Sequence, residues 1–170
     1  MELAMSILAI IISVISVVVS VIIYYVGVER DKKQSTLDAI NILQEQVFDK
    51  VNQYTYAEIR EICDKWKEII GNKNQKELTE EEKENRNFYI DEYRLLSGYL
   101  ARIEHFALGV NTRIYDARIS ERAATLYLSM LYRGKLKPLI ETKHSGKAKG
   151  EYYAEFRKLV EKIEKIEKKL

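Results

Sequence analysis

The chain has 170 residues, with 28 Lys and Arg against 26 Asp and Glu, so its formal net charge is only +2. This near balance argues against a dedicated nucleic-acid-binding protein, which usually carries a strong basic excess. The single Cys excludes an intramolecular disulfide and fits a reducing compartment, while one Pro and seven Gly favour long helices over many strands.

The first element is an apolar run from Leu3 to Val28 that contains no charged residue. As a helix, this run exceeds the ~30 Å hydrocarbon thickness of a bilayer, and lipid offers the backbone polar groups no other partner. We therefore predict a single transmembrane helix within residues 1–29. The alternatives are a cleaved signal peptide, which needs a basic start and a shorter apolar core, and a buried core helix of a soluble protein, which normally has a polar face.

The residues that flank the run predict its orientation. Arg30, Lys32 and Lys33 follow it, whereas only Glu2 precedes it. Because basic residues are retained on the cytoplasmic side, we expect the rest of the chain to lie in the cytoplasm at the inner (cell) membrane. The lipid bilayer is thus the first partner that we expect.

Small residues recur along one side of the predicted span at heptad spacing. They are Ser6, Ala9, Ser13, Ser16, Ser20 and Gly27. Small residues let membrane helices approach closely, and hydroxyls can bond across the contact, so this stripe predicts a seam for self-association. In the alternative interpretation each serine bonds the backbone of its own helix and the register is accidental.

Helical spacing continues beyond the span. Apolar residues three and four apart, from Leu37 to Tyr54, predict that the membrane helix extends into an amphipathic one. Capping boxes at residues 55–58 and 79–82 predict two further helices, the first ending at Gly71 and the second near Gly109. We expect the second of these to bury apolar residues that include Phe88 and Leu95.

The remaining segments are also predicted to be helical. Asp116 is positioned to cap a helix that would bury Ile119, Ala123, Leu126, Met130 and Leu131. Gly134 and Pro138 should interrupt the chain after it, residues 144–150 indicate a basic loop, and the last segment is amphipathic. That last helix docks either on the bundle or on a partner chain.

The fold class that follows is all-α, because no segment alternates with period two. We predict a transmembrane helix (residues 1–29), a cytoplasmic helical domain (residues 30–143), and a basic loop with a C-terminal amphipathic helix (residues 144–170).

Residue types that carry chemistry are few. His144 lies in the predicted loop, neither histidine (His105, His144) has a carboxylate at the spacing of a helical metal site within a predicted helix of its own, and Cys63 lies on the apolar face of its helix. There is no glycine-rich phosphate loop. We therefore expect no catalytic site, no metal and no cofactor, and a protein that is not an enzyme. The basic stretch at residues 133–149 is interpreted as a solvated surface, a contact with an anionic leaflet, or an RNA contact.

One segment resembles a known family. It reads Tyr99-Leu-Ala-Arg-Ile-Glu-His-Phe-Ala-Leu-Gly-Val-Asn-Thr-Arg-Ile-Tyr-Asp116, and a second match follows over residues 128–143. Together they resemble the bacterial domain of unknown function 4760, over about Leu37–Lys143. The resemblance implies a membrane helix followed by a helical cytoplasmic segment, and it implies no activity. The chain has Ala101 where that family often has Asn.

Polar residues stand among apolar ones in the resembling segments. They are Glu104, Asn111, Tyr115, Asp116, Arg122, Tyr132 and Glu141. We expect an architectural network, in which Asn111 bonds exposed backbone at a turn and Glu104 pairs with Arg102 or Arg122. The alternative is a recognition or catalytic site at the same place.

The sequence thus favours a single-pass membrane protein that works through assembly. The first hypothesis is an oligomerising, membrane-tethered interaction or effector module, for instance a regulatory or defence-type effector whose clustered spans perturb the bilayer. The second is a monomeric tether that recruits a cytosolic protein. A membrane-associated enzyme is a third.

Overall fold

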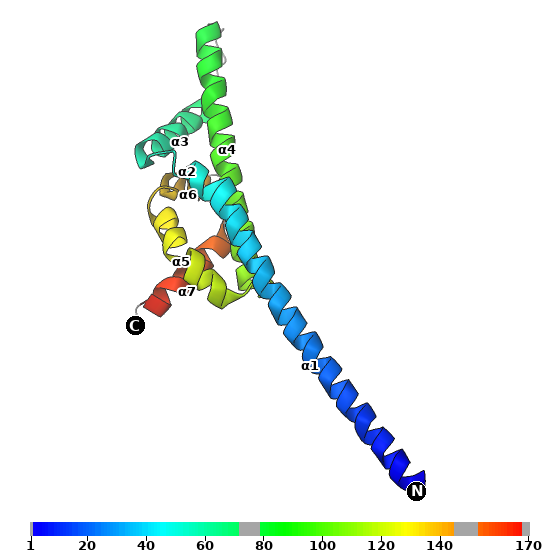
Figure 1. Cartoon of the computed structure of the whole chain (residues 1–170). Coiled ribbons are helices and arrows are strands. Elements are labelled where there is room, and N and C mark those ends of the chain that lie inside the picture. Colours follow the sequence, from blue (N-terminus) through cyan, green and yellow to red (C-terminus); the bar gives the residue numbers. More distant parts are fainter. Residues whose placement is uncertain (1, 72–78, 145–152, 168–170) are drawn as a thin grey trace.

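The computed structural model describes residues 2–71, 79–144 and 153–167, and the regular structure in these ranges is entirely helical. The helices are α1 (Glu2–Leu43), the π-helical turn η1 (Gln44–Phe48), α2 (Asp49–Val51), α3 (Tyr56–Gly71), α4 (Glu80–Asn111), α5 (Ala117–Arg133), α6 (Lys137–His144) and α7 (Ala154–Glu167). Figure 1 shows α1 as a long rod whose N-terminal part extends away from a bundle formed by the other helices. The predicted all-α fold is confirmed.

Helix α1 has two parts with opposite environments. Side chains from Ile10 to Val26 are exposed, and α1 is long and apolar enough to cross a membrane by length and composition. Further along the same helix, Thr36 and Leu43 are buried in the bundle. The predicted continuation of the apolar helix into an amphipathic one is confirmed, although Leu37 is exposed rather than buried.

The turn η1 joins α1 to α2 without interrupting the helical course. The Asp49 N–H donates to the Gln44 carbonyl, five residues earlier. This wider turn adds a residue to the helix and shifts its buried face, so that the adjacent Val47 and Phe48 both enter the core. There the Phe48 ring lies 4.6 Å from that of Tyr127 on α5, measured between centroids.

Both predicted capping boxes are present. The Thr55 N–H donates to Glu58 Oε2 at 2.6 Å, and the Glu58 N–H donates to Thr55 Oγ1 at 3.2 Å. Thr79 and Glu82 make the same reciprocal bonds at 2.8 and 3.3 Å, so α4 begins where its sequence predicts.

The core lies around α4, which contacts α1, η1, α3, α5 and α7. The largest fully buried side chains are Phe156, Ile59, Leu96, Leu100, Ile103, Leu128, Leu136, Leu139, Ile163, Val47, Val51 and Val160. They come from seven helical segments (η1 and α2 to α7) and from the turn before α6, and they belong to one continuous core.

The prediction that certain side chains are buried in the core is wrong. Phe88 and Leu95 on α4 are exposed, as are Ala123, Leu126 and Met130 on α5. The buried face of α5 is instead formed by Ser120, Ala124, Leu128 and Leu131. α5 packs against α1 along this face, where small side chains permit close approach, and a search for large apolar residues selects the other side of the helix.

The end of α4 lies close to its predicted position. The helix passes through Gly109 and ends at Asn111, and the chain reverses over the next residues, with Arg113 in the left-handed region at φ 63°. The predicted interruption after α5 is confirmed, since Gly134 caps that helix and Pro138 lies in the first turn of α6.

The last helix docks on its own bundle. α7 contacts α4 and α5 and buries Phe156, Leu159 and Ile163. Of the two alternatives for this amphipathic helix, docking on the bundle is the one observed. Of the predicted loop over residues 144–150, His144 is instead the last residue of α6, and residues 145–150 lie outside the described residues.

Candidate functional site

Glu104 on α4 binds the beginning of α7 and thereby joins these two helices. Its carboxylate oxygens accept from the backbone N–H groups of Glu155 and Phe156 at 3.0 and 2.8 Å. The first N–H groups of a helix have no partner within the helix, so a carboxylate placed there stabilises it through hydrogen bonds and through the helix dipole. Glu104 is therefore an N-terminal cap supplied from another helix.

Asn111 extends this contact. It lies seven residues after Glu104 on the same face of α4, and its amide donates to the Glu155 carbonyl at 3.0 Å and to Glu155 Oε2 at 2.9 Å. Lys162 donates to the Asn111 side-chain oxygen at 2.7 Å. Hydrogen bonds from Lys158 and from Asn111 hold the pKa of the Glu155 carboxyl below its usual value.

Tyr132 reaches the same place from α5. Its ring meets that of Phe156 edge-on, with centroids 5.0 Å apart, and burial raises the pKa of its hydroxyl. We call Glu104, Asn111 and Tyr132 the α7 docking site. The expected pairing of Glu104 with Arg102 or Arg122 is wrong, because Glu104 binds backbone amides, Arg102 donates to Gln46 on η1, and Arg122 is exposed.

A second group of the predicted residues joins α5 to α1. The Asp116 N–H donates to Thr36 Oγ1 at 2.7 Å, and the buried Thr36 hydroxyl donates to the Lys32 carbonyl at 2.7 Å. The Asp116 carboxylate accepts from the N–H groups of Arg118 and Ile119, so Asp116 caps α5 as predicted. Thr36 thus fixes the first turn of α5 on α1.

Tyr115 packs between these elements. Its ring stacks on Phe106 at 5.5 Å, and its N–H donates to the Gly109 carbonyl at 3.0 Å. A Cβ at Gly109 would lie 2.4 Å from the Tyr115 ring, so glycine is needed here for close approach. The predicted bond from Asn111 to the backbone of this turn is replaced by its bonds to Glu155.

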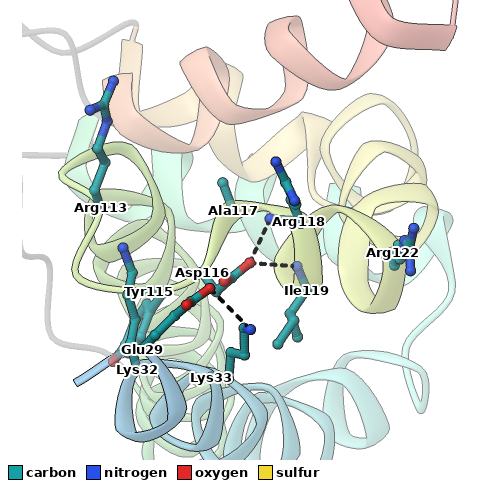
Figure 2. Close-up of a pocket in the computed structure, with 10 residues that line it drawn as sticks. All are labelled: Glu29, Lys32, Lys33, Arg113, Tyr115, Asp116, Ala117, Arg118, Ile119 and Arg122. Carbon is teal, nitrogen blue, oxygen red and sulfur yellow. Dashed lines mark hydrogen bonds and ion pairs between the residues drawn. The ribbon is translucent and has the colours of Figure 1, made fainter. Parts of the chain in front are cut away.

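The first turn of α5, the α4–α5 connection and α1 enclose a pocket of about 800 Å³. It is lined by Glu29, Lys32, Lys33, Arg113, Tyr115, Asp116, Ala117, Arg118, Ile119 and Arg122. Figure 2 shows Glu29, Lys32 and Lys33 of α1 on one side of it and Asp116, Arg118 and Arg122 on the other.

The charges of this pocket are strongly unbalanced. Of its two carboxylates, Glu29 pairs with Lys33 at 3.1 Å and Asp116 caps α5. We call Lys32, Arg113, Arg118 and Arg122 the basic rim; within the described ranges of the chain, none of these four is joined to a carboxylate by an ion pair. The pocket therefore offers cations to an anionic ligand or surface.

The predicted polar residues consequently fall into separate places. Glu104, Asn111 and Tyr132 meet at α7, Tyr115 and Asp116 meet at the α4–α5 connection, and Arg122 lies on the basic rim. Glu141 belongs to neither group, since it is exposed on α6 and pairs with Lys137 at 3.9 Å. Ala101 is exposed on α4.

The sequence did not predict the role of Thr36, because no motif or spacing distinguishes it, and it did not predict that Arg113 and Arg118 line a pocket. The available signal was the pair Arg118 and Arg122, which stand four residues apart on one face of α5, with Glu121 as the one acid three or four residues from either.

The predicted basic stretch at residues 133–149 is largely engaged within the fold where it is described. Arg133 pairs with Glu164 of α7, Lys135 donates to the Asn52 carbonyl at 3.2 Å, and Lys137 pairs with Glu141. Lys147 and Lys149 lie outside the described residues.

The predicted seam is on the exposed part of α1. Ser16 and Ser20 donate to the carbonyls of Ile12 and Ser16 at 2.9 and 2.8 Å, as the alternative interpretation of the stripe expects. Ser13 is exposed and Gly27 partly so, while the side chains of Ser6 and Ala9 lie outside the described residues. Self-association through this stripe stays a prediction.

The cysteine and the two histidines are the residue types that could carry chemistry. Cys63 is buried, as its apolar position predicts, and His105 is exposed. The side chain of His144 lies outside the described residues. In the part of the chain that the structure describes, no group of three His, Cys, Asp or Glu residues is arranged to hold a metal ion.

Comparison with curated proteins and with solved structures finds no match. A family model described as "Domain of unknown function (DUF4760)" matches residues 8–163. The match includes most of the apolar run and most of α7, and so extends beyond the Leu37–Lys143 segment of the sequence resemblance. Because it covers most of the chain, this protein belongs to the DUF4760 family.

Proposed function

We propose that this protein is anchored in a membrane by α1 and that its helical domain is an interaction module held rigidly at the membrane surface. The observation that carries the proposal is the exposure of every described side chain from Ile10 to Val26. A helix that is apolar on all sides needs lipid or protein around it, and the bundle covers none of this segment.

The continuity of α1 supports a permanent anchor over a cleaved signal peptide. The same helix continues from the apolar segment to Leu43, and Thr36 and Leu43 pack inside the bundle. A cleavage after the apolar segment would therefore cut an intact helix close to the residues that hold the domain together. The uninterrupted helix also fixes the direction in which the bundle faces the membrane.

The orientation is proposed from the charges after the apolar run. Arg30, Lys32 and Lys33 favour the cytoplasmic side, which places the bundle in the cytoplasm at the inner membrane.

An interaction role is favoured over catalysis by the engagement of the polar residues. Glu104, Asn111 and Asp116 form their hydrogen bonds at helix ends, whereas the cations of the basic rim have no ion-pair partner among the described residues. Such a module acts either by self-association, as an effector whose spans cluster, or by recruiting a cytosolic protein as a monomer.

Anchoring and orientation are tested in cells with single-cysteine variants. Exposed positions Ser35 and Arg94 are each changed to Cys in a Cys63→Ala background and labelled with a membrane-impermeant maleimide, while alkaline extraction reports membrane integration. We expect resistance to extraction and labelling only after the cells are permeabilised. Extraction into the supernatant would refute the anchor, and labelling of intact cells would refute the orientation.

Self-association is tested by the detergent-corrected mass of the full chain and of the variant Ser13→Leu, Ser16→Leu, Ser20→Leu. The matched control is Ile11→Leu, Val18→Leu, Ile22→Leu on the opposite face of α1. A discrete oligomer that dissociates only in the serine variant would establish the seam. A monomer in all three proteins would exclude clustering and favour the tether that recruits a cytosolic partner.

A further inference from the structure

We propose that the basic rim (Lys32, Arg113, Arg118 and Arg122) binds the phosphate groups of anionic lipids in the leaflet where the apolar part of α1 ends. This proposal rests on the membrane anchoring proposed above. It assigns the pocket beside α1 to a lipid headgroup surface, and it predicts that the bundle lies against the bilayer on the side of its α4–α5 connection.

The position of the rim along α1 matches the headgroup layer. Lys32 follows Val28, the last residue of the apolar run, by four residues, which is roughly 6 Å along a helix axis. The polar layer on each side of a bilayer is about 5–7 Å thick. Thr36, one turn further, holds the Asp116 end of α5 against α1, and Arg113, Arg118 and Arg122 line the same pocket as Lys32.

The bundle is oriented accordingly. Figure 1 shows the connection between α4 and α5 at the end of the bundle that faces the N-terminal half of α1, whereas the beginning of α4 points away from it. Because α1 runs from the apolar segment into the core without a break, this end remains nearest to the membrane.

The rim cations gain little from the fold itself. Arg118 and Arg122 stand four residues apart in the first half of α5, where like charges repel and the helix dipole disfavours cations. The two pocket carboxylates are already engaged, Glu29 by Lys33 and Asp116 by the α5 cap. An external anion would supply the missing countercharge.

The spread of the cations favours a surface over a single small anion. Figure 2 shows the guanidinium groups of Arg113, Arg118 and Arg122 at separate places around the pocket. Next to Arg113, Ile114 leaves 66% of its surface exposed. Cations beside an exposed apolar side chain are typical of contacts with the bilayer interface.

The test uses the full-length protein reconstituted in phosphatidylcholine bilayers. Electron paramagnetic resonance measures the association of spin-labelled phosphatidylglycerol relative to spin-labelled phosphatidylcholine. We expect a preference for phosphatidylglycerol that falls at least about fivefold in the variant Arg113→Gln, Arg118→Gln, Arg122→Gln, because about fivefold is the factor for each surface cation near an anionic leaflet and the variant removes three. Molar salt should also suppress the preference, because screening shortens the reach of each charge.

The matched control is Arg60→Gln, Lys67→Gln, Arg94→Gln, which removes the same charge from exposed positions on α3 and α4. It should keep the lipid preference of the original protein. Equal preference in the original protein and in the rim variant would overturn the proposal, and so would an equal loss in the control. Circular dichroism verifies that both variants remain helical.

A third arm separates lipid from free phosphate. Millimolar inorganic phosphate at constant ionic strength should leave the lipid preference unchanged, and its selective loss would identify a small-anion site instead. Failure of the anchor is distinguishable from either result, because the protein would then be absent from floated vesicles before any lipid preference is measured.

Discussion

The α7 docking site and the three arginines of the basic rim come from one stretch of sequence, but their polar groups are used in opposite ways. At the docking site the carboxylate of Glu104 and the amide of Asn111 point into a helix end and bind backbone groups. On the rim, the guanidinium groups of Arg118 and Arg122 lie at separate places around the pocket, and among the described residues neither forms an ion pair with a carboxylate. A polar residue among apolar ones in this fold therefore either binds another part of the chain or is exposed to a partner.

The difference teaches which residues hold the structure and which are available to a partner. Glu104 and Asn111 satisfy backbone and side-chain groups of α7 that would otherwise lack partners, so their loss should destabilise the fold. The rim arginines satisfy nothing in the described part of the fold, so their loss should leave stability intact. The predictions below test this contrast, in order of decreasing effect on stability.

The largest effect is expected for Glu104→Ala. This change leaves the N–H groups of Glu155 and Phe156 without their acceptor, and we expect the free energy of unfolding to fall by about 2 kcal/mol. Urea denaturation in neutral detergent measures the loss, and hydrogen exchange should show faster exchange at those two amides. Glu141→Ala, at an exposed carboxylate on α6, is the matched control. Equal stability of the two variants would contradict a capping role for Glu104.

A smaller effect is expected where α5 meets α1. Thr36→Val keeps the side-chain shape but removes the oxygen that accepts from the Asp116 N–H, and we expect a loss of about 1.5 kcal/mol. Thr112→Val is the control, since that exposed hydroxyl bonds only the carbonyls of its own helix. The same denaturation measurement applies. An equal loss of stability in Thr112→Val and Thr36→Val would show that the hydrogen bond between α1 and α5 adds nothing to the free energy of unfolding beyond the effect of removing a hydroxyl.

Acid should weaken the docking site before it affects the rim. The pKa of Glu155 is lowered in the folded state by its bonds to Lys158 and Asn111, so its contribution is present above the unfolded pKa and is lost as pH falls through the folded one. We expect weaker protection of the α7 amides, measured as exchange relative to the intrinsic rate at each pH, as the pH falls below about 4.3, the ordinary value for Glu. The variant Glu155→Gln should lose part of this pH dependence, and an unchanged profile would refute the assignment. Arginine stays charged throughout.

Much of the fold follows from local chemistry in the sequence. The capping boxes at Thr55 and Thr79, the Asp116 cap and the apolar length of α1 are short-range signals, and each is found where it was predicted. These signals depend on residues within one or two helical turns, so no knowledge of the tertiary packing is required.

The parts that the sequence did not predict depend on tertiary contacts. The inward face of α5 carries Ser120 and Ala124 because α1 lies close, and an apolar pattern favours the exposed Leu126 and Met130 instead. Likewise, Glu104 finds its partner on α7, some fifty residues later, and no spacing rule links the two. The sequence indicates the rim only by two arginines four residues apart. Lys32 is distant in sequence and reaches the same pocket only in the folded chain.

The smallest effect on stability, and the sharpest test of the contrast, belongs to the rim. The variant Arg113→Gln, Arg118→Gln, Arg122→Gln removes three cations without removing an ion pair among the described residues, and it relieves repulsion on α5. We expect a free energy of unfolding in neutral detergent within about 0.5 kcal/mol of the original protein, as for surface substitutions in general. A loss comparable to that of Glu104→Ala would mean that the arginines support the fold, and the distinction between the two regions would then fail. An unchanged stability together with a changed lipid preference would mean that these residues face a partner outside the chain, which no contact within the bundle can replace.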